Sequence, residues 1–107
     1  MLYKFKSKAT GDLILLEPQG RQILQILGKT PDARGIIEPK DMPAAIQALH
    51  AAVEREEAAR AQAVAEARAQ GEPAPRFEAL ALRQRVVPFV DMLRRAQAEE
   101  ADVVWGV

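Results

Sequence analysis

The sequence of 107 residues contains no cysteine, only 5% aromatic residues and a single histidine. Without cysteine, a disulfide framework, a thiol nucleophile and a thiolate metal site are all excluded, and the chain suits a reducing compartment. No stretch approaches the roughly 20 apolar residues of a membrane span, and lysines interrupt the N-terminal segment where a signal peptide needs an unbroken apolar run. We therefore expect a cytoplasmic protein with no membrane segment.

The chain also lacks net charge, because its 15 basic and 15 acidic residues cancel. This balance removes the strong positive field expected of a protein that holds nucleic acid or anionic lipid mainly by releasing counterions. An apolar content of 49% is enough for one hydrophobic core in a chain of this length and too little for two. We expect a single domain over residues 1–107.

The N-terminal segment is predicted to form a β-hairpin. In residues 2–7, Tyr3 and Phe5 alternate with lysines, so an extended chain places the aromatic rings on one side and the lysines on the other. A Thr-Gly-Asp turn follows. The unbroken apolar run Leu13–Leu16 then predicts a second strand that is buried on both faces.

A Gly-Lys-Thr triplet at residues 28–30 resembles the end of a phosphate-binding loop. Such a loop needs another glycine five residues before Gly28, where this chain has Ile23, and its triplet must open a helix. Here Pro18 suits the first turn of a helix, and Gly28 suits the left-handed position just after the end of that helix. We therefore predict a helix C-terminus at the triplet and no nucleotide site.

A long second helix is predicted after Asp41, a plausible N-cap, and continues through residues 44–70. Its first half carries an apolar stripe that would face the core, whereas its second half is alanine with mixed charges. Pairs of Glu56 and Glu57 with Arg60 are predicted to support this second half. Glycine and two prolines at residues 71–75 end the helix. Residues 54–76 are therefore expected to form a solvated helical arm followed by a proline-rich linker.

A third helix is predicted from an apolar stripe at helical spacing between Leu82 and Ala96. Pro88 lies inside this stripe. Either the helix begins near Val86 with the proline in its first turn, or it begins near Leu82 and kinks, and we favour the longer helix.

Together these elements predict a two-layer α+β domain. The hairpin, a short strand at Ile36 and a C-terminal strand at Val103–Trp105 would form a small sheet of three to four strands. The three helices would pack on one face of this sheet. Its other face, with Lys4 and Lys6, would be solvated or covered by a partner.

His50 is the only histidine and the weak candidate for metal binding. With Glu54 and Glu57 it forms an i, i+4, i+7 set on one helix face. One helix alone rarely closes a metal site, so the alternative interpretation is an exposed histidine beside an acidic, solvated face. No nucleophile has a histidine partner in a recognisable local signature, and we predict no catalytic residue and no cofactor.

Two groups of basic residues are candidates for contact with nucleic acid or an acidic partner. Alternation places the lysines opposite the aromatic rings, whereas a base-stacking surface needs both on one face. Lysines along a strand also discourage edge-to-edge aggregation, and arginines are typical of a solvated helix face. The candidates are Lys4, Lys6, Lys8, Arg83, Arg85, Arg94 and Arg95.

Trp105 lies almost at the end of the chain. A large aromatic residue there stays ordered only if it packs against something. We expect it in the core; the alternative is an anchor for a second subunit, because tryptophan is enriched at interface hot spots.

Four segments, MLYKFKSKATGDLILLEP, MPAAI, LRQRVVPFVDMLRRA and VVWGV, together resemble a small bacterial family, domain of unknown function 1840. The resemblance spans nearly the whole chain. The opening segment is its most specific part and residues 55–76 are the least distinctive. It implies a compact single-domain bacterial protein and carries over no functional residue.

The sequence therefore predicts a non-enzymatic protein-interaction or regulatory module with a protein partner or self-association. The alternatives are a nucleic-acid-binding protein that uses the lysine strand and the four arginines, and a metal-binding protein or enzyme that uses His50.

Overall fold

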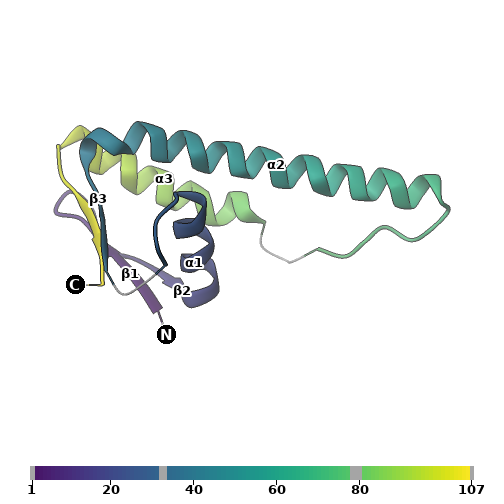
Figure 1. Cartoon of the computed structure of the whole chain (residues 1–107), viewed down its shortest axis with the longest axis horizontal. Coiled ribbons are helices and arrows are strands. Elements are labelled where there is room, and N and C mark those ends of the chain that lie inside the picture. Colours follow the sequence, from purple (N-terminus) through teal and green to yellow (C-terminus); the bar gives the residue numbers. More distant parts are fainter. Residues whose placement is uncertain (1, 32–33, 78–80, 107) are drawn as a thin grey trace.

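The computed structural model describes residues 2–31, 34–77 and 81–106. The strands form one antiparallel sheet in the order β2-β1-β4-β3, and the helices lie on one side of it (Figure 1). This architecture confirms the predicted α+β fold with its N-terminal hairpin and C-terminal strand. In chain order, the elements are β1 Leu2–Lys6, β2 Leu13–Leu16, α1 Glu17–Ile26, β3 Gly35–Ile37, the short 3-10 helix η1 Pro39–Asp41, α2 Met42–Ala69, α3 Leu82–Ala98 and β4 Val103–Trp105.

The hairpin has the predicted arrangement. β1 and β2 pair directly, with Leu2 opposite Leu16. The rings of Tyr3 and Phe5 are buried on the side of the helices. The Tyr3 hydroxyl also donates a hydrogen bond of 2.6 Å to the backbone carbonyl of Pro31, so the polar end of this buried ring is satisfied.

The prediction that Leu13–Leu16 is buried on both faces is wrong. Ile14 and Leu16 are 52% and 61% exposed. β2 is an edge strand and the helices lie on one side only, so the outward side chains of β2 have no layer to pack against. The apolar run therefore predicts the strand correctly, but it does not predict which faces of that strand are buried.

Three aromatic rings organise the core between the sheet and α3. Phe5 lies edge-on to Phe89 with 4.9 Å between ring centroids, and its centroid is 5.7 Å from that of Trp105. Trp105 is 1% exposed, and its indole lies over Gly35, which pairs with it across the sheet. A side chain at Gly35 would occupy the space of the indole, so packing requires a glycine there. Trp105 therefore packs in the core, as expected.

All three helices end at a residue with left-handed backbone geometry. Gly28, Gly71 and Glu100 have φ values of 72°, 71° and 52°. After α1, the Lys29 N–H donates a hydrogen bond to the Leu24 carbonyl, and equivalent bonds close α2 and α3. The Gly-Lys-Thr triplet thus ends a helix, as predicted.

The entry to α2 differs from the prediction. Asp41 precedes the helix, but its backbone is helical and its side chain makes no capping hydrogen bond. The chain enters through η1 instead, and the Met42 N–H bonds to the carbonyl of Pro39. Asp41 therefore occupies the predicted N-cap position, but because its backbone is not extended, its carboxylate does not bond to the N–H groups of the first turn.

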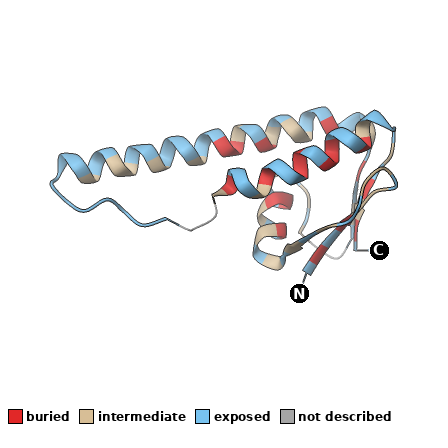
Figure 2. Ribbon diagram, turned by 180° about the vertical axis from the view of Figure 1, so that it is seen from behind, coloured by how far each residue is buried: buried red, intermediate tan, exposed pale blue. Residues whose placement is uncertain are grey.

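The second half of α2 projects from the core as predicted. The buried residues of α2 lie in its first half, ending at Val53, and the rest of the helix is exposed or half-buried (Figure 2). Beyond Gly71 the chain turns and runs back along the helix, where the Arg60 guanidinium lies 4.8 Å from the centroid of the Phe77 ring (Figure 1). This arm gives the molecule its elongated outline of 52 × 28 × 22 Å.

α3 is one helix that begins at Leu82 and contains Pro88, so the longer of the two predicted helices is present. The proline is exposed, on the side of α3 away from the buried Phe89 and Val90. Within the described residues, no helix combines the length and the hydropathy needed to cross a membrane.

The contact between Trp105 and Gly35 gives a first prediction. The substitution Gly35→Ala adds a methyl group where the indole lies, so a rigid ring or the backbone must shift. We expect the free energy of unfolding to fall by about 1–3 kcal/mol. Urea unfolding followed by the fluorescence of the single tryptophan measures this directly. The matched control is Gly11→Ala, where a Cβ meets no atom within 4 Å; equal unfolding midpoints for the two variants would refute the packing requirement.

The end of α3 gives a second prediction. Glu100 adopts a left-handed backbone that favours glycine, so Glu100→Gly should raise the free energy of unfolding by about 1 kcal/mol. Glu99→Gly removes the same charge one residue earlier, where φ is −102°, and should not stabilise the protein. Thermal unfolding of both variants separates backbone strain from charge. Equal shifts in melting temperature would show that the gain comes from the charge alone.

Candidate functional site

The face of the sheet opposite the helices exposes several large apolar side chains. Side chains from all four strands point to it, and we call this surface the outer face. Within it, Leu2, Ile14, Leu16 and Ile36 are 57%, 52%, 61% and 42% exposed. The members of the outer face are Leu2, Lys4, Lys6, Ile14, Leu16, Ile36 and Val104.

The strand register explains how these side chains gather. Leu2 pairs with Leu16 and lies next to Ile14, which forms an apolar corner on β1 and β2. On the other side of the sheet, Val104 pairs with Ile36 to form a second apolar strip on β4 and β3. Large aliphatic side chains at neighbouring outward positions are unusual on a solvated sheet, where polar residues normally alternate with the buried ones.

Lys4 and Lys6 lie on β1 between the two apolar parts of the outer face, as the alternation predicts. The outward positions of the four strands carry these two lysines and no carboxylate. Lys4 pairs with Ile14 and Lys6 pairs with Val104, so a positive charge lies in the middle of an otherwise apolar surface.

Lys8 lies apart from the outer face. Together with Lys6 it borders an open hollow of about 740 Å³ beyond the end of β1, and carboxylates line the same hollow. These are Asp12, Glu99, Glu100 and Asp102. Because acidic groups outnumber the lysines there, the predicted row of three lysines does not form a continuous positive track.

The four arginines of α3 do not form one cluster. Arg83 donates two hydrogen bonds of 2.8 Å to Glu57 on α2, and Arg95 pairs with Asp91 at 3.1 Å. Arg85 donates to the Gln22 side chain on α1. Arg94 faces the groove between α2 and α3 that is described below. Nucleic-acid binding through these residues stays a prediction, but the arginines point to different surroundings.

Two carboxylates at the base of the arm fasten α2 to the start of α3. Glu56 accepts a hydrogen bond of 3.0 Å from the Leu82 backbone N–H and pairs with Arg60 at 2.6 Å. Its negative charge therefore lies at the positive end of the α3 dipole. Glu57 accepts both bonds from Arg83, where the sequence predicted a pair with Arg60. The linker brings Arg83 to Glu57, a long-range contact that local spacing does not predict.

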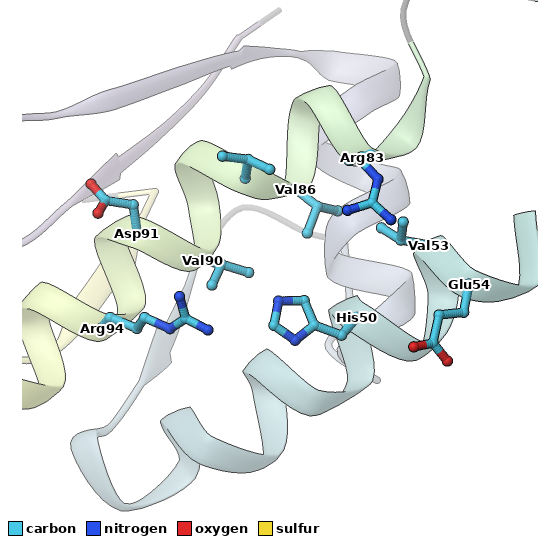
Figure 3. A pocket seen from close by; sticks show the side chains of 9 residues that line it. His50, Val53, Glu54, Arg83, Val86, Val90, Asp91 and Arg94 are labelled. Carbon is cyan, nitrogen blue, oxygen red and sulfur yellow. The ribbon is translucent and has the colours of Figure 1, made fainter. Parts of the chain in front are cut away.

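His50, Glu54 and Glu57 lie along one side of α2, but they do not converge. Glu57 is held by Arg83, and Glu54 points away from His50 (Figure 3). No group of three or more histidine, cysteine or acidic side chains in the described ranges is arranged to hold a metal ion. Any chemistry through His50 must therefore use neighbours from another element.

Such neighbours occur in an open groove between α2 and α3 with a volume of about 420 Å³ (Figure 3). Its apolar wall consists of valines from both helices, and charged side chains stand at its rim. The lining residues are His50, Val53, Glu54, Arg83, Val86, Val87, Val90, Asp91 and Arg94. This groove brings the predicted candidates His50, Arg83 and Arg94 together.

Sequence reasoning missed the apolar part of the outer face. Ile14 and Leu16 stand in a run without polar residues, which is typical of a strand covered on both sides. The missing information was the number and position of the helices, because only three helices on one side leave the other side bare. The short connection from β2 directly into α1 is the one local signal, since it keeps α1 on the inner side.

The fold and these surfaces define a small α+β domain with a four-stranded sheet that is covered on one side. The chain belongs to the family described as Domain of unknown function (DUF1840), whose model matches residues 1–105. This match confirms the resemblance found in the sequence. Comparison with curated proteins and with solved structures finds no match.

The pair between Arg83 and Glu57 gives a third prediction. Its hydrogen bonds and the positive charge of Arg83 hold the pKa of Glu57 below its ordinary value, although desolvation opposes this. A carboxyl with a lowered folded pKa stabilises the protein above its unfolded pKa, and this contribution is lost as the pH falls through the folded value. Arg83→Gln should therefore raise the pKa of Glu57, which carboxyl NMR measures directly. Arg95→Gln removes an exposed pair elsewhere on α3 and should leave that pKa unchanged; an equal rise would contradict the pairing.

Proposed function

We propose that this protein is a non-enzymatic interaction module and that its outer face binds an amphipathic segment of another protein. The observation that carries the proposal is the exposure of four large aliphatic side chains on one continuous sheet face. Full burial of a leucine or isoleucine stabilises by about 1.5–3 kcal/mol, so covering four half-exposed ones contributes on the order of 1 kcal/mol each. The four together supply about 4 kcal/mol, which corresponds to a dissociation constant of about 1 mM, so other contacts of the segment must supply the rest of the affinity.

The lysines of the outer face determine which charge the partner segment must carry. Lys4 lies between the apolar corner of β1 and β2 and the apolar strip of β4 and β3, and the strands offer no carboxylate on this side. A partner that covered the outer face with apolar side chains alone would bury an unpaired ammonium group, which is costly. The complementary segment therefore presents apolar side chains on both sides of one or more carboxylates.

The same lysines argue against a symmetric pair of copies through this face. Two outer faces packed together would place Lys4 and Lys6 of both copies in one interface. Like charges in a desolvated interface cost several kcal/mol, which would cancel the gain from the aliphatic side chains. A different protein with an acidic apolar segment avoids that repulsion.

Photo-cross-linking tests this proposal. A photoreactive phenylalanine analogue replaces Ile14 in the chain expressed in its native host, and a second variant carries it at Gln62 on the exposed side of the arm. We expect an adduct at Ile14 whose cross-linked peptide combines apolar residues with aspartate or glutamate. Lys4→Glu should abolish this adduct, whereas Lys8→Glu should leave it in place, because only Lys4 lies within the apolar surface.

The identified peptide then allows a quantitative measurement. Leu16→Asp should weaken its binding about tenfold or more in calorimetry, because the variant loses apolar contact and repels the carboxylate. Leu16 is exposed, so the variant should fold as the unmodified protein does. Adducts to a second copy, to a phospholipid or to a basic segment would each overturn the proposal, as would the absence of any adduct specific to Ile14.

A further inference from the structure

The groove between α2 and α3 has an apolar wall of four valines, one of which is exposed to solvent. Val53, Val86 and Val90 form its buried floor, and Val87 stands at its side with 59% of its surface exposed. The groove measures about 420 Å³, which lies in the lower part of the range for small-molecule sites. A ligand that uses this wall must have an apolar body.

The charges at the rim of the groove are divided between two ends. At one end, Arg83 is neutralised by its two hydrogen bonds to Glu57, and the charge of Glu54 adds to this effect. Asp91 also lines the groove, on the side of Arg94, and its carboxylate pairs with Arg95 at 3.1 Å on the surface of α3 (Figure 3).

At that other end, the side chains of His50 and Arg94 point toward one another across the groove, with Val90 between and behind them (Figure 3). Within residues 2–31, 34–77 and 81–106, neither side chain has a hydrogen-bond or ion-pair partner. This end therefore offers a permanent positive charge and an imidazole, both directed at the same space above an apolar floor.

We infer that the groove binds a small monocarboxylate with an aliphatic body. The carboxylate would lie between Arg94 and His50, where the guanidinium can donate two parallel hydrogen bonds and the imidazole a third. The aliphatic body would extend along the valines toward Arg83. A single negative charge matches the single unneutralised guanidinium of the groove, and an ion without an apolar body would leave the exposed side chain of Val87 uncovered. This site is separate from the outer face.

NMR titration with octanoate tests the inference in the full-length protein. His50 is the only histidine, so the signal of its imidazole carbon-bound proton reports on this groove alone. We expect octanoate to shift that signal in a saturable way. Octan-1-ol, which has the same body without the carboxylate, should bind at least about tenfold more weakly, because it cannot form a charge-assisted hydrogen bond.

Two matched variants identify the groups responsible. Arg94→Gln should weaken octanoate binding about tenfold, whereas Arg68→Gln removes an exposed positive charge on the arm, which does not line the groove, and should have little effect. Val87→Ser should weaken it several-fold by removing part of the apolar wall. Arg94 and Val87 are both exposed, so these variants should fold normally, which circular dichroism checks.

Three results would overturn the inference. The first is the absence of a saturable shift of the His50 signal with octanoate at millimolar concentration. The second is equal binding of octanoate and octan-1-ol, which would mean that the groove binds aliphatic chains without recognising the carboxylate. The third is an equal loss of binding in Arg94→Gln and Arg68→Gln, which would reduce the effect to general surface charge.

Discussion

The packing of the Trp105 indole over Gly35 is the contact on which the rest of the fold depends. Because a glycine faces the tryptophan, the largest side chain of the chain fits between β4 and the helices without displacing β3. β4 then lies between β1 and β3 and brings Trp105 against Phe5, whose ring meets Phe89 of α3. One C-terminal strand thus joins the N-terminal hairpin to the middle of the chain and directs every aromatic ring of the sheet to the same side.

This concentration of aromatic rings on one side has a consequence for the other side. The helices pack on the inner side, where they bury the rings of β1, and no element among the described residues covers the outer face. The alternation of β1 supplies lysines there, which suit solvent, but β2 and β3 supply isoleucine and leucine. The outer face thus combines lysines, which favour water, with aliphatic side chains, which do not. Such a surface suits the proposed binding segment, which is apolar with an acidic centre.

The sequence predicted most of the fold because the main signals are local. Period-two alternation located β1, the left-handed glycine after Leu27 located the end of α1, and the apolar stripe located α3 from Leu82 onward. The errors arose where the answer depends on distant parts of the chain. Burial of β2 depends on how many helices reach the outer face, and the partner of Glu57 depends on the linker that returns α3 to α2. The groove was missed for the same reason, since its walls come from two helices.

The base of the arm shows how one helix serves two environments. Up to Val53, α2 packs against the core with apolar side chains. Beyond Val53, Glu56 and Glu57 occupy the side of α2 that faces α3. Their bonds to the Leu82 N–H and to Arg83 hold the start of α3 beside α2 by polar contacts instead of apolar ones. Polar pairs hold the helices together at this end without filling the space between them, and Val87 beside them stays exposed. The groove is therefore a direct result of changing from apolar to polar attachment at the point where α2 leaves the core.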